Sequence, residues 1–412
     1  MSSLEKNAIT FLRPGRPDYQ KKAMSMNNFT LHTPTKILFG QGQIAQLREQ
    51  LPSDARVMIT YGGGSVVRSG LLEQIRNQLA GMTLFEFGGI EPNPAYETLM
   101  GAVELARAER VDFLLAVGGG SVLDGTKFIA AAAHYDLARD PWHILETVGS
   151  EVRSAIPLGS VLTLPATGSE MNMGAVITRR SSGDKVHFFS PFVMPRFAVL
   201  DPVLTYTLPE RQVANGVVDA FVHIVEQYLT YPVNAKVQDR FAEGLLLTLI
   251  EEGPKALAEP HNYEVRANIM WSATMALNGL IGAGVPQDWA THMLGHELTA
   301  LHGLDHAQTL AVVLPALLQA KRKQKHAKLL QYAERVWGLN SGSEAERIDD
   351  AIAATRDFFE RMGVKTRLRD YGLKDLGIDT LIGKLGEHGM TAIGEHGDID
   401  LVQSQHIYEA AW

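Results

Sequence analysis

The sequence contains no cysteine among its 412 residues. This absence excludes a disulfide scaffold, a thiolate metal site, a cysteine nucleophile and an iron–sulfur cluster, so histidine and carboxylate side chains must hold any metal ion. The chain also lacks a hydrophobic run as long as the ~20 residues of a membrane helix. Because its net charge is −8, we expect no nucleic-acid partner, and we expect no membrane partner either.

The first residues lack the features of a targeting signal. Residues 1–25 mix basic and acidic side chains with prolines and contain no hydrophobic core of signal-peptide length. The acid-free, amphipathic bias of a transit peptide is missing as well. We therefore expect residues 1–25 to be an extension that is disordered or not native, and we expect the protein to be cytoplasmic.

Two regions of different pattern follow the extension. In the first, short apolar runs predict strands at 56–60, 83–87, 112–117, 160–164 and 197–200. Helical spacing between these runs indicates βαβ units and a parallel sheet with helices on both sides, and 176–189 is typical of a hairpin. After about residue 205 only helices are predicted, at 209–230, 235–251, 263–281, 286–302, 306–320, 326–337, 343–362 and 376–388. We expect an α/β domain at 26–205 and an all-helical domain at 206–412.

One glycine loop predicts a phosphate site. GGGSVLD at 118–124 follows an apolar strand and opens a helix. Glycines let backbone N–H groups approach a phosphate, Ser121 adds a hydroxyl, and the helix N-terminus adds partial positive charge. The pattern predicts pyrophosphate binding and makes 26–205 a dinucleotide-binding domain, although it is not the GxGxxG fingerprint.

Two further loops follow predicted strands. GGGS at 62–65, with Arg68 beyond it, offers no carboxylate to a ribose 2′-hydroxyl. Because an acidic residue there would repel a 2′-phosphate, its absence favours NADP over NAD. LTLPATGSE at 162–170 offers hydroxyl and backbone donors at the same edge of the sheet.

Histidine spacing predicts a metal site. Asp219 and His223 lie four residues apart and interrupt an apolar helix, where burying them is costly unless a cation satisfies them. The pairs 292/296 and 302/306 have the same spacing, so each pair can share a helix face. Asp219, His223 and two histidines from 292–306 suit Zn²⁺ or Fe²⁺. The chain has no HExxH motif, which argues against a metalloprotease.

Four segments together resemble a known family. They are GGGSVLDGTK (118–127), LPATGSE (164–170), NGVVDAFVHIVEQY (215–228) and HMLGHELTALHGLDHAQTLAVVLP (292–315). From about Met26 onward the chain resembles the iron-containing (group III) alcohol dehydrogenases, in their NADP-dependent aldehyde-reductase, butanol-dehydrogenase-like branch. The resemblance implies a dinucleotide-binding domain, a helical domain and a metal in the cleft between them.

The resemblance also implies roles for individual residues. It assigns the metal, zinc or iron, to Asp219, His223, His292 and His306, and it leaves His296 beside the site and His302 outside it. We expect a water or His296 to protonate the product oxygen. It implies cofactor contacts from Gly63, Ser65, Asn93, Gly119, Gly120, Ser121, Thr163, Thr167, Asn172 and Lys185. The chain departs from the family at Ala307, where glycine is usual, and over the C-terminal LVQSQHIYEAAW.

The expected reaction is the reversible, NADPH-dependent reduction of aldehydes to primary alcohols, with the metal polarising the carbonyl and hydride moving from nicotinamide C4. A homodimer is a further expectation from the family. One alternative is an NAD-dependent polyol or glycerol dehydrogenase of the same superfamily. A lyase of the dehydroquinate-synthase type is disfavoured because 284–310 lacks the lysine and arginine that its substrate would need. The four candidate ligands argue against a non-catalytic scaffold.

Overall fold

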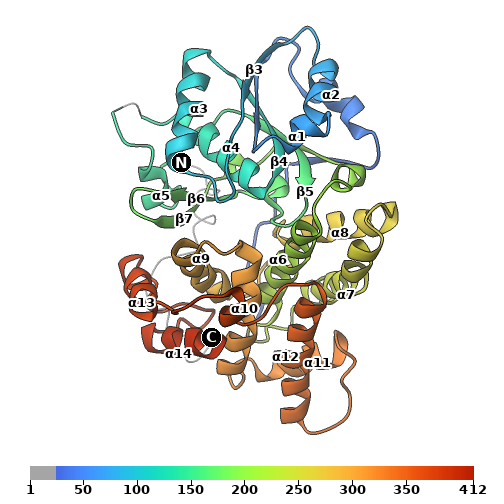
Figure 1. Ribbon diagram of the computed structural model, residues 1–412, viewed down its shortest axis with the longest axis vertical. Helices are drawn as coiled ribbons and strands as arrows, with labels where there is room; N and C mark the ends of the chain where they lie inside the picture. The colour runs from blue at the N-terminus through green and yellow to red at the C-terminus, as the bar shows by residue number, and fades with distance from the viewer. Residues whose placement is uncertain (1–24, 137) are drawn as a thin grey trace.

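The computed structural model describes residues 25–136 and 138–412. The predicted extension at 1–25 therefore lies outside the described residues, apart from Ser25. Figure 1 shows a sheet flanked by helices in one half of the molecule and a group of helices in the other. The expected order, a parallel α/β portion followed by helices, is confirmed.

The main sheet has six parallel strands in the order β1-β8-β5-β4-β2-β3. The strands are β1 (Lys36–Phe39), β2 (Arg56–Tyr61), β3 (Thr83–Phe87), β4 (Phe113–Gly119), β5 (Leu158–Leu164) and β8 (Phe197–Leu200). The central strands are buried on both faces, which explains their continuous apolar sequences. β1 was not predicted; this edge strand has four residues and buries one of them only.

Helices cover both faces of the sheet. Val57 and Ile59 of β2 pack on one side with the helices at 43–50 and 71–78, whereas Met58 packs on the other side with α3 and α4. These elements are η2 (Gln43–Gln50), α1 (Ser65–Arg68), α2 (Leu71–Gln78), α3 (Tyr96–Ala108), α4 (Gly120–Ala133) and α5 (His143–Glu146). The segment between β2 and β3 forms two helices, α1 and α2, because the chain turns at Gly70.

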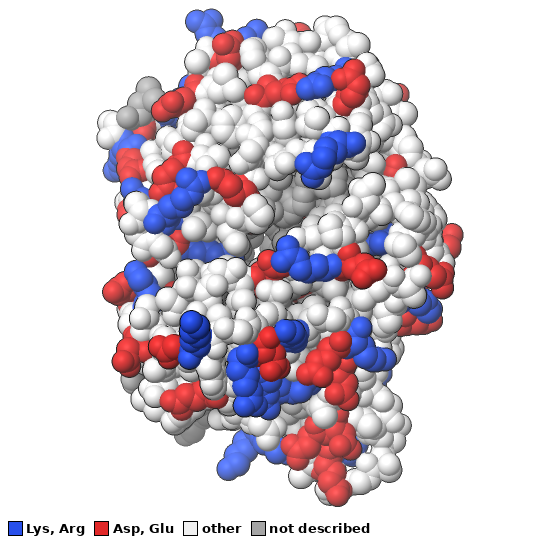
Figure 2. All heavy atoms as spheres, in the orientation of Figure 1, with Lys and Arg blue, Asp and Glu red and all other residues white. Residues whose placement is uncertain are grey.

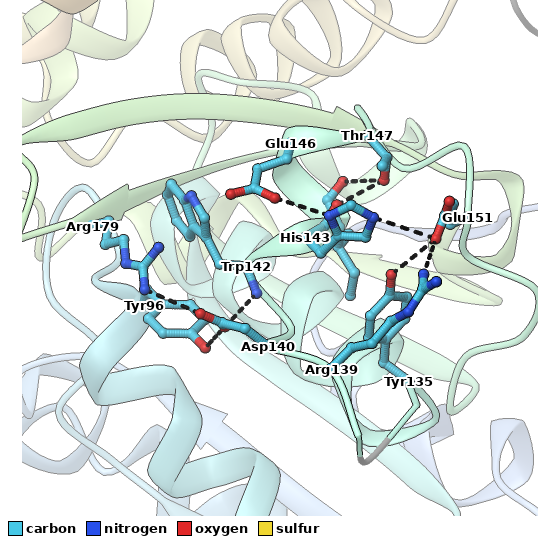
Figure 3. A network of polar contacts seen from close by, with 11 residues as sticks. Tyr96, Tyr135, Arg139, Asp140, Trp142, His143, Glu146, Thr147, Glu151 and Arg179 are labelled. Atoms are coloured by element: carbon cyan, nitrogen blue, oxygen red, sulfur yellow. Dashed lines mark hydrogen bonds and ion pairs between the residues drawn. The ribbon is translucent and has the colours of Figure 1, made fainter.

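A separate hairpin, β6 (Gly174–Arg179) and β7 (Asp184–Phe189), confirms the one predicted from the sequence. Side chains around α5 fasten it to the sheet portion, as Figure 3 shows. Asp140 accepts hydrogen bonds from Tyr96 of α3 and from Arg179 of β6, and the Arg179 guanidinium also lies over the Trp142 ring. The hairpin is therefore held to α3 next to its turn at 180–183.

The second portion consists of helices. They are α6 (Glu210–Tyr228), α7 (Lys236–Ala258), α8 (Tyr263–Ala276), α9 (Ala290–His302), α10 (His306–Ala320), α11 (His326–Arg335), α12 (Glu344–Arg361), α13 (Ile378–Glu387) and α14 (Leu401–Ala411). None of the helices in the described part of the chain is both long and apolar enough to span a membrane.

Two boundaries in this portion differ from the sequence expectation. The helix expected at 209–230 begins at Glu210, with Pro209 as its N-cap, and ends at Tyr228. The helix expected from 286 begins at Ala290, because Trp289 has a left-handed backbone with a φ of 61°. α14 was not predicted at all.

Candidate metal and cofactor site

Helix α6 brings Asp219 to the edge of the sheet. The first half of α6 packs so closely on the loop after β5 that a β-carbon at Gly216 would clash with the Pro165 carbonyl oxygen. Glycine is therefore required there, and Asp219 follows one turn later on the buried side of the helix. His223 lies one further turn along the same buried face, as the i,i+4 spacing predicts.

Helices α9 and α10 bring the two other predicted ligands to the same place. α9 ends at Gly303, whose φ of 68° turns the chain back. Asp305 then caps α10 in a capping box with Gln308, so His306 is the first residue of α10. The amide of Asn215 on α6 donates to Asp305 over 2.7 Å and ties this turn to the helix that carries Asp219.

Three imidazoles surround one carboxylate oxygen. The Nε2 atoms of His223, His292 and His306 lie 3.6, 3.8 and 3.8 Å from Oδ1 of Asp219. These separations are too long for hydrogen bonds. The ligand atoms of Asp219, His292 and His306 all lie within 4.8 Å of one another, so these three groups can share an ion, and His223 lies beside them on α6. Ligand atoms about 2.1 Å from a tetrahedral centre lie about 3.4 Å from one another.

The cluster also contains polar atoms that no group of the described chain satisfies. Asp219 Oδ1, His223 Nδ1, His292 Nε2 and His306 Nδ1 are all buried without a hydrogen-bond partner. Unsatisfied buried polar atoms are costly, and a divalent cation would satisfy those that face the centre of the cluster. The donor set of three imidazoles and one carboxylate fits Zn²⁺ or Fe²⁺.

The protonation states suit a metal. Burial lowers the pKa of His223 to about 4 and that of His306 well below its ordinary value. Burial acts to raise the pKa of Asp219, but the neighbouring His223 and His292 outweigh it and lower that pKa. At neutral pH Asp219 is thus a carboxylate and His223 and His306 are neutral, which are the forms that bind metal ions. Burial acts to lower the pKa of His292, but Glu226 and Asp219 outweigh it and raise that pKa to about 9, so metal binding there must release a proton.

Glu226 is a functional residue that the sequence analysis missed. Its carboxylate is hydrogen-bonded to Nδ1 of His292, so the Nε2 atom of that ring faces Asp219. A carboxylate behind a metal-binding histidine fixes the orientation of the ring. The signal was available, because Glu226 lies three residues after His223 in the same buried helix.

The two remaining histidines of 292–306, His296 and His302, lie in different places. The ring of His296 is buried with its centre 5.2 Å from that of His306, so it lies beside the cluster. Nε2 of His302 instead lies 3.0 Å from the Leu376 carbonyl oxygen, away from the cluster.

The predicted cofactor residues gather at the carboxyl ends of the strands. The chain passes from β2 to β3 on one side and returns to β4 on the other, so the strand order reverses between β2 and β4. Ligands of such sheets bind at this position. Gly63 follows β2 and Ser65 begins α1, whereas Gly119 ends β4 and Gly120 and Ser121 begin α4. Thr163 lies in β5, and Thr167 and Asn172 lie in the segment between β5 and β6. Asn93, on the loop after β3, donates its backbone N–H to Ser121 Oγ over 3.3 Å.

Lysines approach this edge from two elements. Lys127 of α4 is fully buried and donates to Asn172 Oδ1 over 2.9 Å and to the Gly174 carbonyl over 2.8 Å. Lys185 of β7 is buried and lies close enough to Asp219 to interact with it electrostatically. Burial lowers the pKa of Lys185 to about 8, against the opposing charges of Asp219 and Asp124. Lys127 belongs to the motif at 118–127, but no role was predicted for it from the sequence.

Comparisons with known proteins agree with this arrangement. The family described as "Iron-containing alcohol dehydrogenase" matches residues 34–202, and "Fe-containing alcohol dehydrogenase family, C-terminal" matches 213–410. The NADPH-dependent aldehyde reductase YqhD of Escherichia coli is 72% identical over 94% of this chain and 100% of its own length. Its crystal structure gives a TM-score of 0.94 at 71% identity, over 95% of this chain and 100% of that one. A probable NADH-dependent butanol dehydrogenase of Bacillus subtilis is 42% identical over 88% of this chain and 95% of its own.

Proposed function

The chain belongs to the iron-containing alcohol dehydrogenase family, and we propose that Asp219, His223, His292 and His306 hold its divalent metal. The protein is an oxidoreductase that reduces aldehydes to alcohols with NADPH. The observation that carries the ligand assignment is the set of three Nε2 atoms within 3.8 Å of one Asp219 oxygen. Zn²⁺ and Fe²⁺ both suit this donor set.

A bound divalent cation supplies Lewis acidity to the aldehyde oxygen. The residues around it hold the reactants in place. Glu226 fixes the ring of His292, and the loops after β2, β4 and β5 bind the dinucleotide so that its nicotinamide reaches the cluster. We assign the transfer of a proton to the product oxygen to His296, because its buried ring lies beside the cluster and outside the four ligands.

We propose that the loop after β2 selects NADPH through Arg68. The guanidinium Nη1 of Arg68 lies 3.5 Å from the position of a β-carbon on Gly64, so this charge is at the predicted cofactor loop. No carboxylate stands among residues 62–65 to accept a ribose 2′-hydroxyl. A 2′-phosphate would meet Arg68 and the Ser65 hydroxyl instead, which supports the preference for NADPH.

Chelation tests the proposed site directly. The purified protein should contain about one metal ion per chain and should oxidise NADPH when butanal is added. Dialysis against a chelator should abolish turnover, and Zn²⁺ or Fe²⁺ should restore it while Mg²⁺ should not. Full turnover by metal-free protein would overturn the proposed metal centre.

We also propose two domains, 26–205 and 206–412. The buried side chains around the sheet fall between Leu38 and Leu200 with the exception of Met270, whereas the other buried clusters run from Val213 to Ala411. Limited proteolysis should cut first near residues 201–209 if the two portions fold as separate units.

We further propose a homodimer that uses the segment at 26–31. Met26, Phe29 and Leu31 are exposed on this segment, and Val237 and Phe241 are exposed on α7. Asn27 donates to the Gly284 carbonyl over 2.8 Å, and Met26 contacts Gln238, so the segment lies over α7. Burying this apolar surface would favour association. Light scattering should give twice the mass of one chain, and Phe241→Glu should reduce the measured mass to that of one chain.

We also propose a cytoplasmic location, because the enzyme consumes NADPH. Cell fractionation tests this location.

A further inference from the structure

The imidazole of His388 joins the sheet portion to the helical portion, at a point outside the cluster of Asp219 and its histidines. His388 follows α13 directly, and its Nδ1 lies 2.7 Å from Glu297 Oε1 on α9. Its Nε2 lies 3.1 Å from Asp184 Oδ1 at the start of β7. Figure 1 shows the β6–β7 hairpin next to α9 and α13, where the sheet portion faces the helical portion.

Each partner of His388 is the chain neighbour of a residue in the site. Lys185 follows Asp184 on β7, and its buried amine is close enough to interact electrostatically with Asp219. His296 precedes Glu297 on α9. Because successive residues of a strand point to opposite faces, Asp184 can hold β7 from behind while Lys185 faces the site.

The charges around His388 favour an imidazolium that donates from both nitrogens. The hydrogen bond to Glu297 raises the pKa of His388 to about 9, with burial opposing it and Asp184 adding to it. Other groups face the same cluster: Lys384 lies 3.6 Å from Asp184 and 2.8 Å from Glu387, Ser182 bonds to Asp184, and Tyr408 lies near Glu297. The ordinary pKa of histidine is about 6.5. The double contact is therefore present at neutral pH and is lost as the pH rises through about 9.

We propose that His388 is a positioning residue that joins the β6–β7 hairpin to α9 and holds Lys185 at a fixed place beside Asp219 and its histidines. The Asp184–His388–Glu297 bridge fixes the distance between the hairpin and α9. Hydride transfer depends on that distance, because the reacting atoms must approach within ~3–3.5 Å. This role rests on the proposed site only in that Lys185 and His296 face the reactants.

Charge-removing variants with steady-state kinetics test the role. His388→Gln and Asp184→Asn should each lower kcat/KM for NADPH about tenfold, with the metal content and unfolding midpoint close to those of the wild type. Asp379→Asn, which changes an exposed carboxylate on α13, is the matched control and should be silent. If His388→Gln does not fold, Asp184→Asn still decides the question.

The pH dependence separates positioning from a general structural effect. In the wild type, kcat/KM for NADPH should fall as the pH passes about 9. His388→Arg keeps a permanent cation, so it should recover most of the activity and remove that step. Wild-type kinetics in both charge-removing variants, or an unchanged step in His388→Arg, would overturn the inference. An inactive wild type would instead overturn the proposed function, so the two failures are distinguishable.

Discussion

The carboxylate of Glu226 holds His292 at two points. One oxygen bonds to the Nδ1 atom of the ring, and the other accepts the backbone N–H of His292 over 3.2 Å. The ring and its backbone are thus tied to α6, the same helix that carries Asp219 and His223. The relative position of α6 and α9 therefore determines the direction of the His292 lone pair.

Replacing Glu226 with glutamine should weaken metal binding while leaving the fold intact. Glutamine keeps the size of the side chain but removes the charge that orients the imidazole, and such partners are worth about 10–100-fold in metal affinity. Titration with a competing chelator measures the effect. Glu210→Gln, in the exposed first turn of α6, is the control, and equal affinities in the two variants would show that Glu226 has no such role.

Removing a proposed ligand should abolish both metal binding and aldehyde reduction. We expect Asp219→Ala or His306→Ala to purify as folded, metal-free protein, because each deletes one of four donors and the chain has no cysteine to replace it. Metal analysis and NADPH oxidation with butanal are the measurements. His302→Ala should retain metal and activity, since its ring is bonded to the Leu376 carbonyl. Loss of metal in the His302→Ala variant would show that His302 is a ligand and would overturn the present assignment of the fourth ligand.

The cofactor preference should depend on Arg68. Charge-assisted hydrogen bonds contribute about 1.5–3 kcal/mol each, so Arg68→Ala should lower kcat/KM for NADPH by about 10–100-fold and leave NADH unaffected. Kinetics with both cofactors on one aldehyde make NADH the internal control. Equal losses with both cofactors would contradict a contact with the 2′-phosphate.

A carboxylate introduced into the loop after β2 should also weaken the preference for NADPH. The structure favours Gly63 for this test over Gly64, because Gly64 has a φ of 95°, whereas a β-carbon at Gly63 meets nothing within 4 Å. Gly63→Asp places a negative charge near the 2′-phosphate without backbone strain, so NADPH should be weakened more than NADH. A variant that still prefers NADPH to the wild-type extent would rule out this loop.

Loss of Lys127 should destabilise the sheet portion. Lys127 is fully buried, and its ammonium donates to Asn172 and to the Gly174 carbonyl and interacts electrostatically with Asp124 and Glu170. Lys127→Met would leave these buried acceptors without their donor, and an unsatisfied buried group costs about 1–3 kcal/mol. Urea unfolding measures the loss, with Lys323→Met at an exposed position as the control. A shift below ~1 kcal/mol would mean that neighbouring groups compensate.

Local sequence pattern was sufficient for most of the elements, though not for β1 or α14, and for the pairs of residues within them. The apolar runs of β2, β4 and β5 are buried on both faces as expected, and the glycines at 118–120 do join β4 to α4. The pairing of Asp219 with His223 also follows from one helix period. Such patterns report which face of an element is buried, because that face repeats every two residues in a strand and about every 3.6 in a helix.

Spacing alone could not decide which elements meet. The pairs 292/296 and 302/306 have identical spacing, yet the turn at Gly303 and Asp305 sends His306 toward Asp219 and leaves His302 near Leu376. Glu226 gains its partner because α9 packs against α6, and His388 gains both of its partners from elements more than 90 residues away in sequence. These contacts arise from the tertiary packing of distant segments, which local periodicity does not encode.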